Sequence, residues 1–212
     1  MTTSKSTESV RLHLGCGRDV RPGWVNVDSQ PGEGVEVVCD LDALADARLP
    51  LGDDSVDEFL GSHLLEHLRN PLPFMQELHR VAKPGAMLTF HVPYGSSDDA
   101  YTDPTHHRPY FIQSFGFFSQ PYYWRADYGY RGDWQPGYVL LKVDGTEFAG
   151  QNPDQILSAV MTLRNVVQEM TVVMTAIKPI RAQDRSLQQQ PHIEFQLVGD
   201  PVGDPVAENA QC

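Results

Sequence analysis

Short apolar segments with β-strand character recur in the first 93 residues, and four of them end on a glycine or a polar side chain. The segments lie at 9–14, 23–28, 35–40, 55–63 and 87–93. Strand, loop, strand and helix in this alternation predict a parallel sheet covered by helices. Because ligands of such sheets bind outside the carboxyl ends of the strands, we expect the polar segment ends to form one site.

One helix is expected between the last two of these segments. Apolar residues recur at helical spacing from Leu64 to Val81, and Pro71 and Pro73 interrupt the run. Since proline is tolerated only in the first turn of a helix, the pattern predicts a short turn and then a helix from about Pro73. The Lys-Pro-Gly-Ala sequence at 83–86 ends that helix.

The middle of the chain has a different character. Residues 94–138 hold 14 of the 20 aromatic residues and show no clear period. We interpret about 94–150 as an aromatic-rich insertion or lid. Its aromatic side chains suit the wall of a pocket or a homodimer surface, since aromatic residues are enriched in both.

The last third returns to regular patterns. A helix is expected over 152–170, where Asn152 is the candidate N-cap and Pro153 fits the first helical position. The β-rich segments 171–180 and 192–199 follow, joined by a polar loop. We expect them to form a closing antiparallel pair.

Composition limits the class of protein. The chain has 212 residues, which is room for one domain; we expect it over 9–199, with a flexible N-terminus at 1–8 and a disordered tail at 200–212. The net charge of −12 disfavours nucleic acid as a partner. No apolar run is long enough to span a membrane, and no secretory signal is visible. The three cysteines match no zinc pattern, so a cytoplasmic location is expected.

The turn Gly15-Cys16-Gly17 lets the backbone approach a ligand closely, because glycine has no Cβ. A dinucleotide fingerprint would need a third glycine where Val20 stands, and an acid about 20 residues further on. The acid that ends the second segment, Asp28, comes much sooner. A nicotinamide or flavin cofactor is therefore disfavoured.

Several ordered motifs resemble one family. The motifs LHLGCG, GWVNVD, CDLDAL, LPLGDDSVDEFLGSHLLEHL and LHRVAKPGAML look like class I S-adenosylmethionine-dependent methyltransferases. Within that class they resemble a small branch with LNLGCG, GWINVD, LEH and RVLKPGG-like motifs, over about residues 10–93. The resemblance implies an α/β fold, a Rossmann-like three-layer sandwich with a mostly parallel sheet and an antiparallel C-terminal strand. The link at 15–23 is too short for a helical crossover, so the first crossover must be shortened.

The resemblance also implies S-adenosyl-L-methionine as the cofactor. Glycine backbone would pass its tail, Asp28 would accept both ribose hydroxyls, and Asp40 with Leu41 would meet the adenine. The residues expected to bind it are Gly15, Cys16, Gly17, Asp28, Asp40, Leu41, Ser62 and His63.

Methyl transfer to oxygen benefits from a general base. His106 and His107 are the candidates, because they follow the fifth segment, where this fold admits its acceptor. His63 and His67 would share a helix face, but no third ligand is evident, so no metal is expected.

The expected function is methyl transfer to a small-molecule or saccharide-type acceptor, most simply at oxygen. Two alternatives stay open. One is a module that binds S-adenosylmethionine or S-adenosylhomocysteine without turnover. The other is a nucleotide-sugar or dinucleotide enzyme on a related fold.

Overall fold

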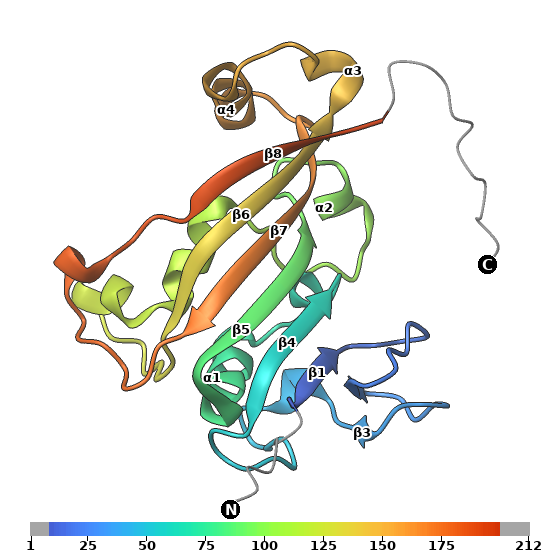
Figure 1. Cartoon of the computed structure of the whole chain (residues 1–212), viewed down its shortest axis with the longest axis vertical. Coiled ribbons are helices and arrows are strands. Elements are labelled where there is room, and N and C mark those ends of the chain that lie inside the picture. The colour runs from blue at the N-terminus through green and yellow to red at the C-terminus, as the bar shows by residue number, and fades with distance from the viewer. Residues whose placement is uncertain (1–8, 200–212) are drawn as a thin grey trace, which may run out of the picture.

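The computed structural model describes residues 9–199, which form one mixed sheet with the strand order β3-β2-β1-β4-β5-β7-β6-β8 (Figure 1). The strands are β1 (Arg11–Leu14), β2 (Val25–Asp28), β3 (Val37–Val38), β4 (Val56–Ser62), β5 (Ala82–Pro93), β6 (Trp134–Asp144), β7 (Val167–Ala176) and β8 (His192–Val198). Neighbouring strands are parallel, except that β7 runs antiparallel to both β5 and β6. The predicted Rossmann-like, mostly parallel sheet is confirmed, but its antiparallel strand is β7, whereas the C-terminal strand β8 runs parallel to β6.

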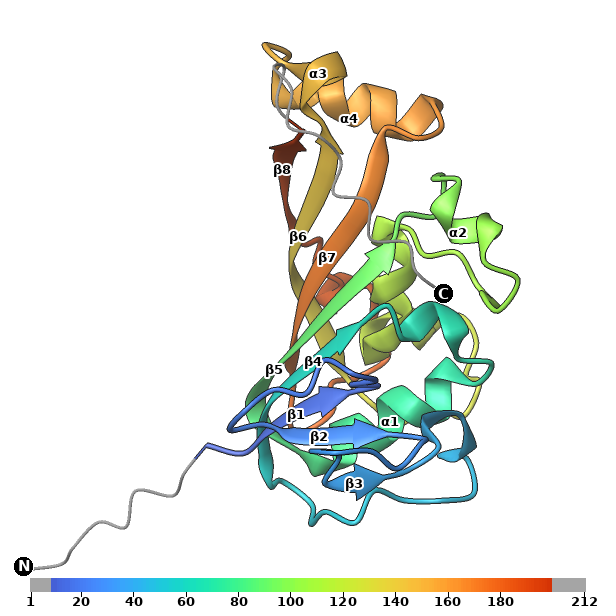
Figure 2. The same ribbon diagram turned by 90° about the vertical axis from the view of Figure 1, so that its right-hand side faces the viewer.

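Helices and helical turns connect these strands. They are α1 (Pro71–Val81), α2 (Asp99–Thr102), α3 (Gly145–Phe148) and α4 (Pro153–Thr162), with the 3-10 turns η1 (Leu41–Ala43), η2 (Leu65–His67), η3 (Ile112–Phe118), η4 (Gln120–Trp124) and η5 (Arg185–Leu187). Figure 2 shows α1 and α2 on the same side of the sheet, while α3 and α4 lie at the far end of β6 and β7. The apolar face of α1 is fully buried through Phe74, Met75 and Leu78.

The link between β1 and β2 contains turns and no helix, so the shortened first crossover is confirmed. Gly15 and Gly17 both have positive φ, at 61° and 51°, which only glycine adopts freely. Between them the Cys16 N–H donates to the Val27 carbonyl at 3.0 Å and ties the turn to β2. The chain therefore passes directly from the end of β1 to the neighbouring strand.

Three expectations for the second half are wrong. Residues 134–144 are strand β6 rather than part of the insertion, which ends at Asp133. The segments at 171–180 and 192–199 do not pair, because β6 lies between β7 and β8. The helix expected over 152–170 ends at Thr162, although Asn152 caps it as predicted, by accepting from the Gln155 N–H.

Strand β6 was not predicted from the sequence because two of its residues are unfavourable in a strand. Pro136 cannot donate a ladder hydrogen bond, and Gly137 follows it inside the strand. The pairing with β7 shifts register between Pro136 and Tyr138, which accommodates both residues. Trp134, at the start of β6, is completely buried and donates its indole N–H to the Met75 carbonyl at 2.9 Å.

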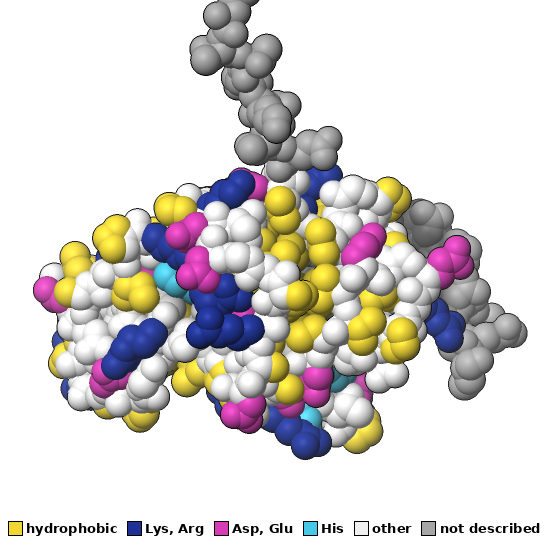
Figure 3. Space-filling model, turned by 90° about the horizontal axis from the view of Figure 1, so that it is seen from below, with side chains coloured by type: hydrophobic (Ala, Val, Ile, Leu, Met, Phe, Trp, Pro, Cys, Tyr) yellow, Lys and Arg dark blue, Asp and Glu magenta, His cyan; other side chains and the backbone are white. Residues whose placement is uncertain are grey.

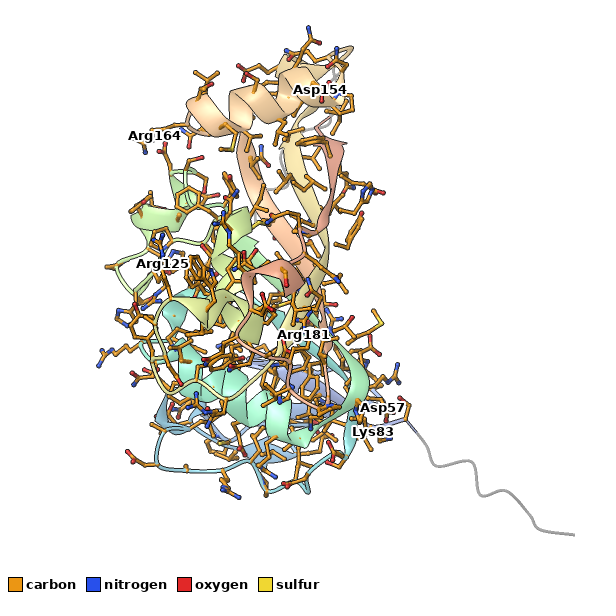
Figure 4. The ribbon with its side chains drawn as sticks, turned by 90° about the vertical axis from the view of Figure 1, so that its left-hand side faces the viewer. Asp57, Lys83, Arg125, Asp154, Arg164 and Arg181 are labelled. Carbon is orange, nitrogen blue, oxygen red and sulfur yellow. The ribbon has the colours of Figure 1, made fainter. Side chains whose placement is uncertain are left out.

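A buried ion pair joins the aromatic segment to the loop between β7 and β8. Asp133 is completely buried, and its carboxylate accepts from Arg181 Nε at 2.8 Å and Nη2 at 2.7 Å. The same carboxylate accepts from the Ser119 hydroxyl and the Gln120 N–H, both at 3.2 Å. Arg181 reaches these groups from the loop in the middle of the molecule (Figure 4).

Gly61→Ala is expected to lower the free energy of unfolding by about 1–3 kcal/mol, the usual effect of overpacking a core. A Cβ at Gly61 would lie 2.7 Å from a ring carbon of Phe90, which is fully buried. Urea denaturation of both proteins measures the difference. Gly52→Ala is the matched control, because a Cβ there meets nothing within 4 Å. Equal losses in the two variants would contradict the packing described here.

The surface carries charges of both signs. On the face seen in Figure 3, Lys and Arg side chains stand beside Asp and Glu side chains, with apolar side chains between them. Proteins that bind the phosphate backbone of a nucleic acid typically carry a stripe of basic side chains, and the described part of this face does not have that pattern. Within residues 9–199, none of the helices combines the length and apolar character that crossing a membrane requires.

Candidate active site

A cavity of about 340 Å³ lies at the carboxyl ends of β1 and β2, where the sequence predicts a ligand. We call it the strand-end cavity. Its lining residues are Gly15, Asp28, Ser29, Cys39, Asp40, Leu41, Asp42, Leu64, His67 and Leu68. Four of the residues predicted to bind the cofactor, Gly15, Asp28, Asp40 and Leu41, therefore come together as expected.

The Asp28 carboxylate is held in one orientation by the backbone. Its Oδ2 accepts from the Gly17 N–H at 2.8 Å, and its Oδ1 accepts from the Gln30 N–H at 2.9 Å. Each carboxylate oxygen has a second lone pair, so both oxygens remain able to accept from a ligand. A fixed pair of acceptors of this kind suits two neighbouring hydroxyl groups.

The glycine turn forms one wall of the cavity. A Cβ at Gly15 would lie 2.9 Å from Leu64 Cδ1, and the positive φ of this residue already excludes most side chains. Cys16 points into the core, where burial and the nearby Asp28 raise the pKa of its thiol. The thiol is therefore protonated at neutral pH and serves as a small packed side chain.

The next strand end supplies a polar and an apolar group side by side. Asp40 caps η1 by accepting from the Asp42 N–H at 3.0 Å through Oδ1, which leaves Oδ2 for a ligand. Leu41 is buried beside it and lines the same cavity. Asp42, the nearby alternative, instead accepts from the Asn70 N–H at 2.8 Å.

Cys16, Gly17, Ser62 and His63, also predicted at the cofactor, do not line the strand-end cavity. His63 has a positive φ of 48°, so the chain turns sharply at the end of β4. Its imidazole lines a second cavity of about 450 Å³, the histidine cavity. That cavity is lined by His63, Pro93, Asp99, Asp103, His106, Lys142, Gln168, Glu169 and Val198.

Charges are paired across the histidine cavity. His63 Nε2 lies 2.9 Å from Glu169 Oε2, and this contact, with a smaller contribution from Glu66, raises the pKa of His63 to about 10. His63 and Lys142 together lower the pKa of Glu169 to about 2. At neutral pH the cavity therefore presents an imidazolium, an ammonium and several carboxylates.

A pair of imidazoles links the lining of one cavity to the lining of the other. His67 lines the strand-end cavity and His106 lines the histidine cavity, and their ring centroids are 4.7 Å apart. His107 lies elsewhere: it is exposed and accepts from Arg69 Nε at 3.2 Å. The structure thus separates the two predicted bases. It adds His67, which the sequence indicated only through the LEH motif and as a possible helix-face neighbour of His63.

A family model described as a methyltransferase domain matches residues 12–90. This stretch runs from β1 to β5 and contains every residue that lines the strand-end cavity. The methyltransferase domain thus coincides with the part of the chain whose motifs resemble the family.

Solved structures support the fold. One chain of a Haloferax volcanii complex, between a methyltransferase and the methyltransferase activator Trm112, superposes with a TM-score of 0.51 at 16% identity, covering 80% of this chain and 83% of that chain. A Listeria monocytogenes protein described as an S-adenosylmethionine-dependent methyltransferase gives 0.50 at 10% identity, covering 81% and 91%. No curated protein sequence matches the chain.

The match of residues 12–90 to a methyltransferase domain agrees with the predicted class I S-adenosylmethionine-dependent methyltransferase and with S-adenosyl-L-methionine as its cofactor, and the two solved structures agree with the fold. The methyltransferase domain fits this cofactor on its own geometry. Gly15 lines the strand-end cavity without a side chain, and its positive φ and the nearby Leu64 side chain disfavour a larger residue there. Asp28 presents two oriented acceptors, and Leu41 offers an apolar surface beside the free oxygen of Asp40.

Beyond the methyltransferase domain, the aromatic insertion walls a third cavity of about 520 Å³. Leu72, Arg108, Tyr110, Phe111, Gln113, Ser114, Phe117, Phe118, Tyr123 and Tyr128 line it. A pocket wall was one of the two roles predicted for these aromatic residues. Like the histidine cavity, this cavity shares no lining residue with the strand-end cavity.

Proposed function

We propose that the protein transfers a methyl group from S-adenosylmethionine to a hydroxyl oxygen of a small, saccharide-type acceptor bound in the histidine cavity. The observation that carries this proposal is the contact of His67 with His106, which joins the strand-end cavity to the histidine cavity. The second cavity is lined mainly by charged and hydrogen-bonding side chains. Such a lining suits an acceptor with several hydroxyl groups better than an apolar one.

S-adenosylmethionine supplies an electrophilic methyl group on a sulfonium, so the protein mainly has to align donor and acceptor. Gly15 and Asp28 would hold the donor, and Asp40 with Leu41 would hold its adenine. The acceptor oxygen gains the methyl group and loses its proton, while the electron pair of the broken carbon–sulfur bond stays on sulfur. The acceptor side of the site must therefore take up one proton.

We assign His106, rather than His107, to the acceptor side. His106 lines the histidine cavity, whereas His107 is exposed and occupied by Arg69. His63 is less suited to accept a proton, because its raised pKa keeps it protonated at neutral pH.

The full chain, incubated with methyl-labelled S-adenosylmethionine and a panel of mono- and disaccharides, is expected to give a labelled O-methyl product. Mass spectrometry of the product identifies the methylated atom. Product labelled only on nitrogen, or on none of the hydroxylated acceptors, would contradict the proposal.

Thermal denaturation separates the two alternative functions. Saturating S-adenosylhomocysteine is expected to raise the Tm by about 5–10 °C, the effect of a ligand at a hundred times its Kd on a chain of this size. NAD is expected to give no shift. A shift with NAD alone would favour a dinucleotide enzyme, and a shift with S-adenosylhomocysteine but no turnover would favour a binding module.

A further inference from the structure

We propose that Glu66, His67 and His106 bind one divalent transition-metal ion at the junction of the strand-end and histidine cavities. One donor atom from each of these residues lies within 4.8 Å of the other two. The site itself stands on this geometry, and only its role in catalysis rests on the proposed function. No metal was expected from the sequence, because the third ligand comes from a distant loop.

The first observation that supports the site is the burial of the Glu66 carboxylate. Its side chain is only 3% exposed, and both carboxylate oxygens are buried without a hydrogen-bond partner among residues 9–199. The His63 imidazolium forms an ion pair with Oε1 at 3.4 Å, without the geometry of a hydrogen bond, and Oε2 has no partner of either kind among the same residues. A carboxylate withdrawn from water is strongly unfavourable unless cations or several donors compensate it. A second cation, bound at Oε2, would complete this compensation.

The hydrogen bonds around His67 fix its tautomer. The Thr105 hydroxyl donates its only hydrogen to Asp103 Oδ1 at 2.6 Å, since a carboxylate can only accept. Thr105 Oγ1 must then accept at its 2.9 Å contact with His67 Nδ1. His67 therefore carries its proton on Nδ1, and Nε2 presents a bare lone pair.

The tautomer of His106 is fixed in the same way, by a hydrogen bond to a different partner. Its Nδ1 lies 3.3 Å from the Ala100 carbonyl oxygen, which can only accept, so the proton is on Nδ1. Nε2 again presents a bare lone pair. Metal-binding histidines almost always donate their second N–H to a carbonyl or a polar side chain in this way, which fixes the ring and its tautomer. Both imidazoles are thus prepared as ligands.

Two imidazole nitrogens and one carboxylate oxygen select the class of ion. This donor set suits zinc and other first-row transition ions, and with three protein ligands the ion keeps open positions. Donor atoms on a tetrahedral ion are about 3.3 Å apart, so the three side chains would close in slightly on binding. Asp103 Oδ2 lies 4.0 Å from His106 Nε2, and the Asp103 side chain is 46% exposed.

The place of the ion gives it a role in the proposed reaction. His67 belongs to the strand-end cavity and His106 to the histidine cavity, so an ion between them would bind an acceptor hydroxyl where it meets the methyl group. A bound divalent ion lowers the pKa of a coordinated hydroxyl. His106 then acts as a ligand of the ion, and the acceptor proton leaves from the coordinated oxygen to water.

The test is cobalt binding by the tag-free full chain after chelator treatment, with Co²⁺ as the probe and its visible absorption as the readout. We expect one equivalent of Co²⁺ to give a d–d spectrum that Zn²⁺ displaces. Glu66→Gln and His106→Gln should each weaken Co²⁺ binding at least 30-fold. His192→Gln, at an exposed histidine remote from the cluster, should leave binding unchanged. Circular dichroism checks that each variant is folded.

S-adenosylhomocysteine binding, measured on the same samples, separates the two proposals. If S-adenosylhomocysteine binds but Co²⁺ fails to bind, or binds equally to all variants, the metal site is overturned while the proposed function stands. If Co²⁺ binding depends on Glu66 and His106 but S-adenosylhomocysteine does not bind, the metal site stands and the proposed function fails. Loss of O-methyl product after chelation, restored by Zn²⁺ or Co²⁺, would tie the ion to catalysis.

Discussion

Asp28→Ala lowers the affinity for S-adenosylhomocysteine at least 100-fold, which corresponds to a loss of at least about 2.7 kcal/mol. The expected loss comes from two hydrogen bonds to a charged acceptor, each worth about 1.5–3 kcal/mol. The Gly17 and Gln30 N–H groups that now orient the carboxylate also lose their acceptor, so the turn beside the ligand loosens. Isothermal titration calorimetry measures the change.

Two controls distinguish ligand binding from a general effect on the protein. Asp46→Ala removes an exposed carboxylate that does not line the strand-end cavity, and it should leave the Kd unchanged. Asp28→Asn keeps the size of the side chain and one acceptor oxygen, so its Kd should lie between those of Asp28→Ala and the unmodified protein. Equal affinities for Asp28→Ala and Asp46→Ala would remove Asp28 from the site.

Asp133→Ala should lower the free energy of unfolding by about 3–5 kcal/mol, because breaking a buried ion pair leaves its partner uncompensated. Asp133 is 0% exposed and Arg181 only 18% exposed, so little water replaces the lost contacts. The Ser119 hydroxyl and the Gln120 N–H also lose their acceptor. Chemical denaturation curves give the free energies directly.

The same segment offers a matched control. Asp127 pairs with Arg131 at 2.9 Å, but these side chains are 41% and 55% exposed. An exposed pair contributes only about 0–1 kcal/mol, so Asp127→Ala should change stability little. An equal loss of stability in Asp133→Ala and Asp127→Ala would contradict this account. It would mean that the Asp133–Arg181 pair does not anchor the loop between β7 and β8 to the aromatic-rich insertion.

The first half of the fold could be predicted because local signals agree there with the final structure. The glycine turn, Asp28 and Asp40 mark strand ends, and strand ends of a parallel sheet converge whatever the helices do. β6 could not be predicted, since Pro136 and Gly137 interrupt the strand pattern and only the register shift in the sheet reconciles them. Because β6 was not predicted, the segments at 171–180 and 192–199 were wrongly expected to pair with each other.

The candidate site, like the fold, could be predicted only in part. The cofactor residues on strand ends came together, but Ser62 and His63 did not join them, because the backbone turns at the positive φ of His63. That turn also prevents His63 from sharing a face with His67, as a continuous helix would require. His106 lies in a loop, and it contacts His67 only because of the conformation of that loop. The spacing of residues in the sequence does not reveal this conformation.

A crystal structure with S-adenosylhomocysteine would show directly where the cofactor binds. We expect the ligand in the strand-end cavity, with both ribose hydroxyls donating to the Asp28 carboxylate and its homocysteine part along the backbone of Gly15 to Gly17. Ligand bound elsewhere, or a ribose that makes no contact with Asp28, would contradict this expectation.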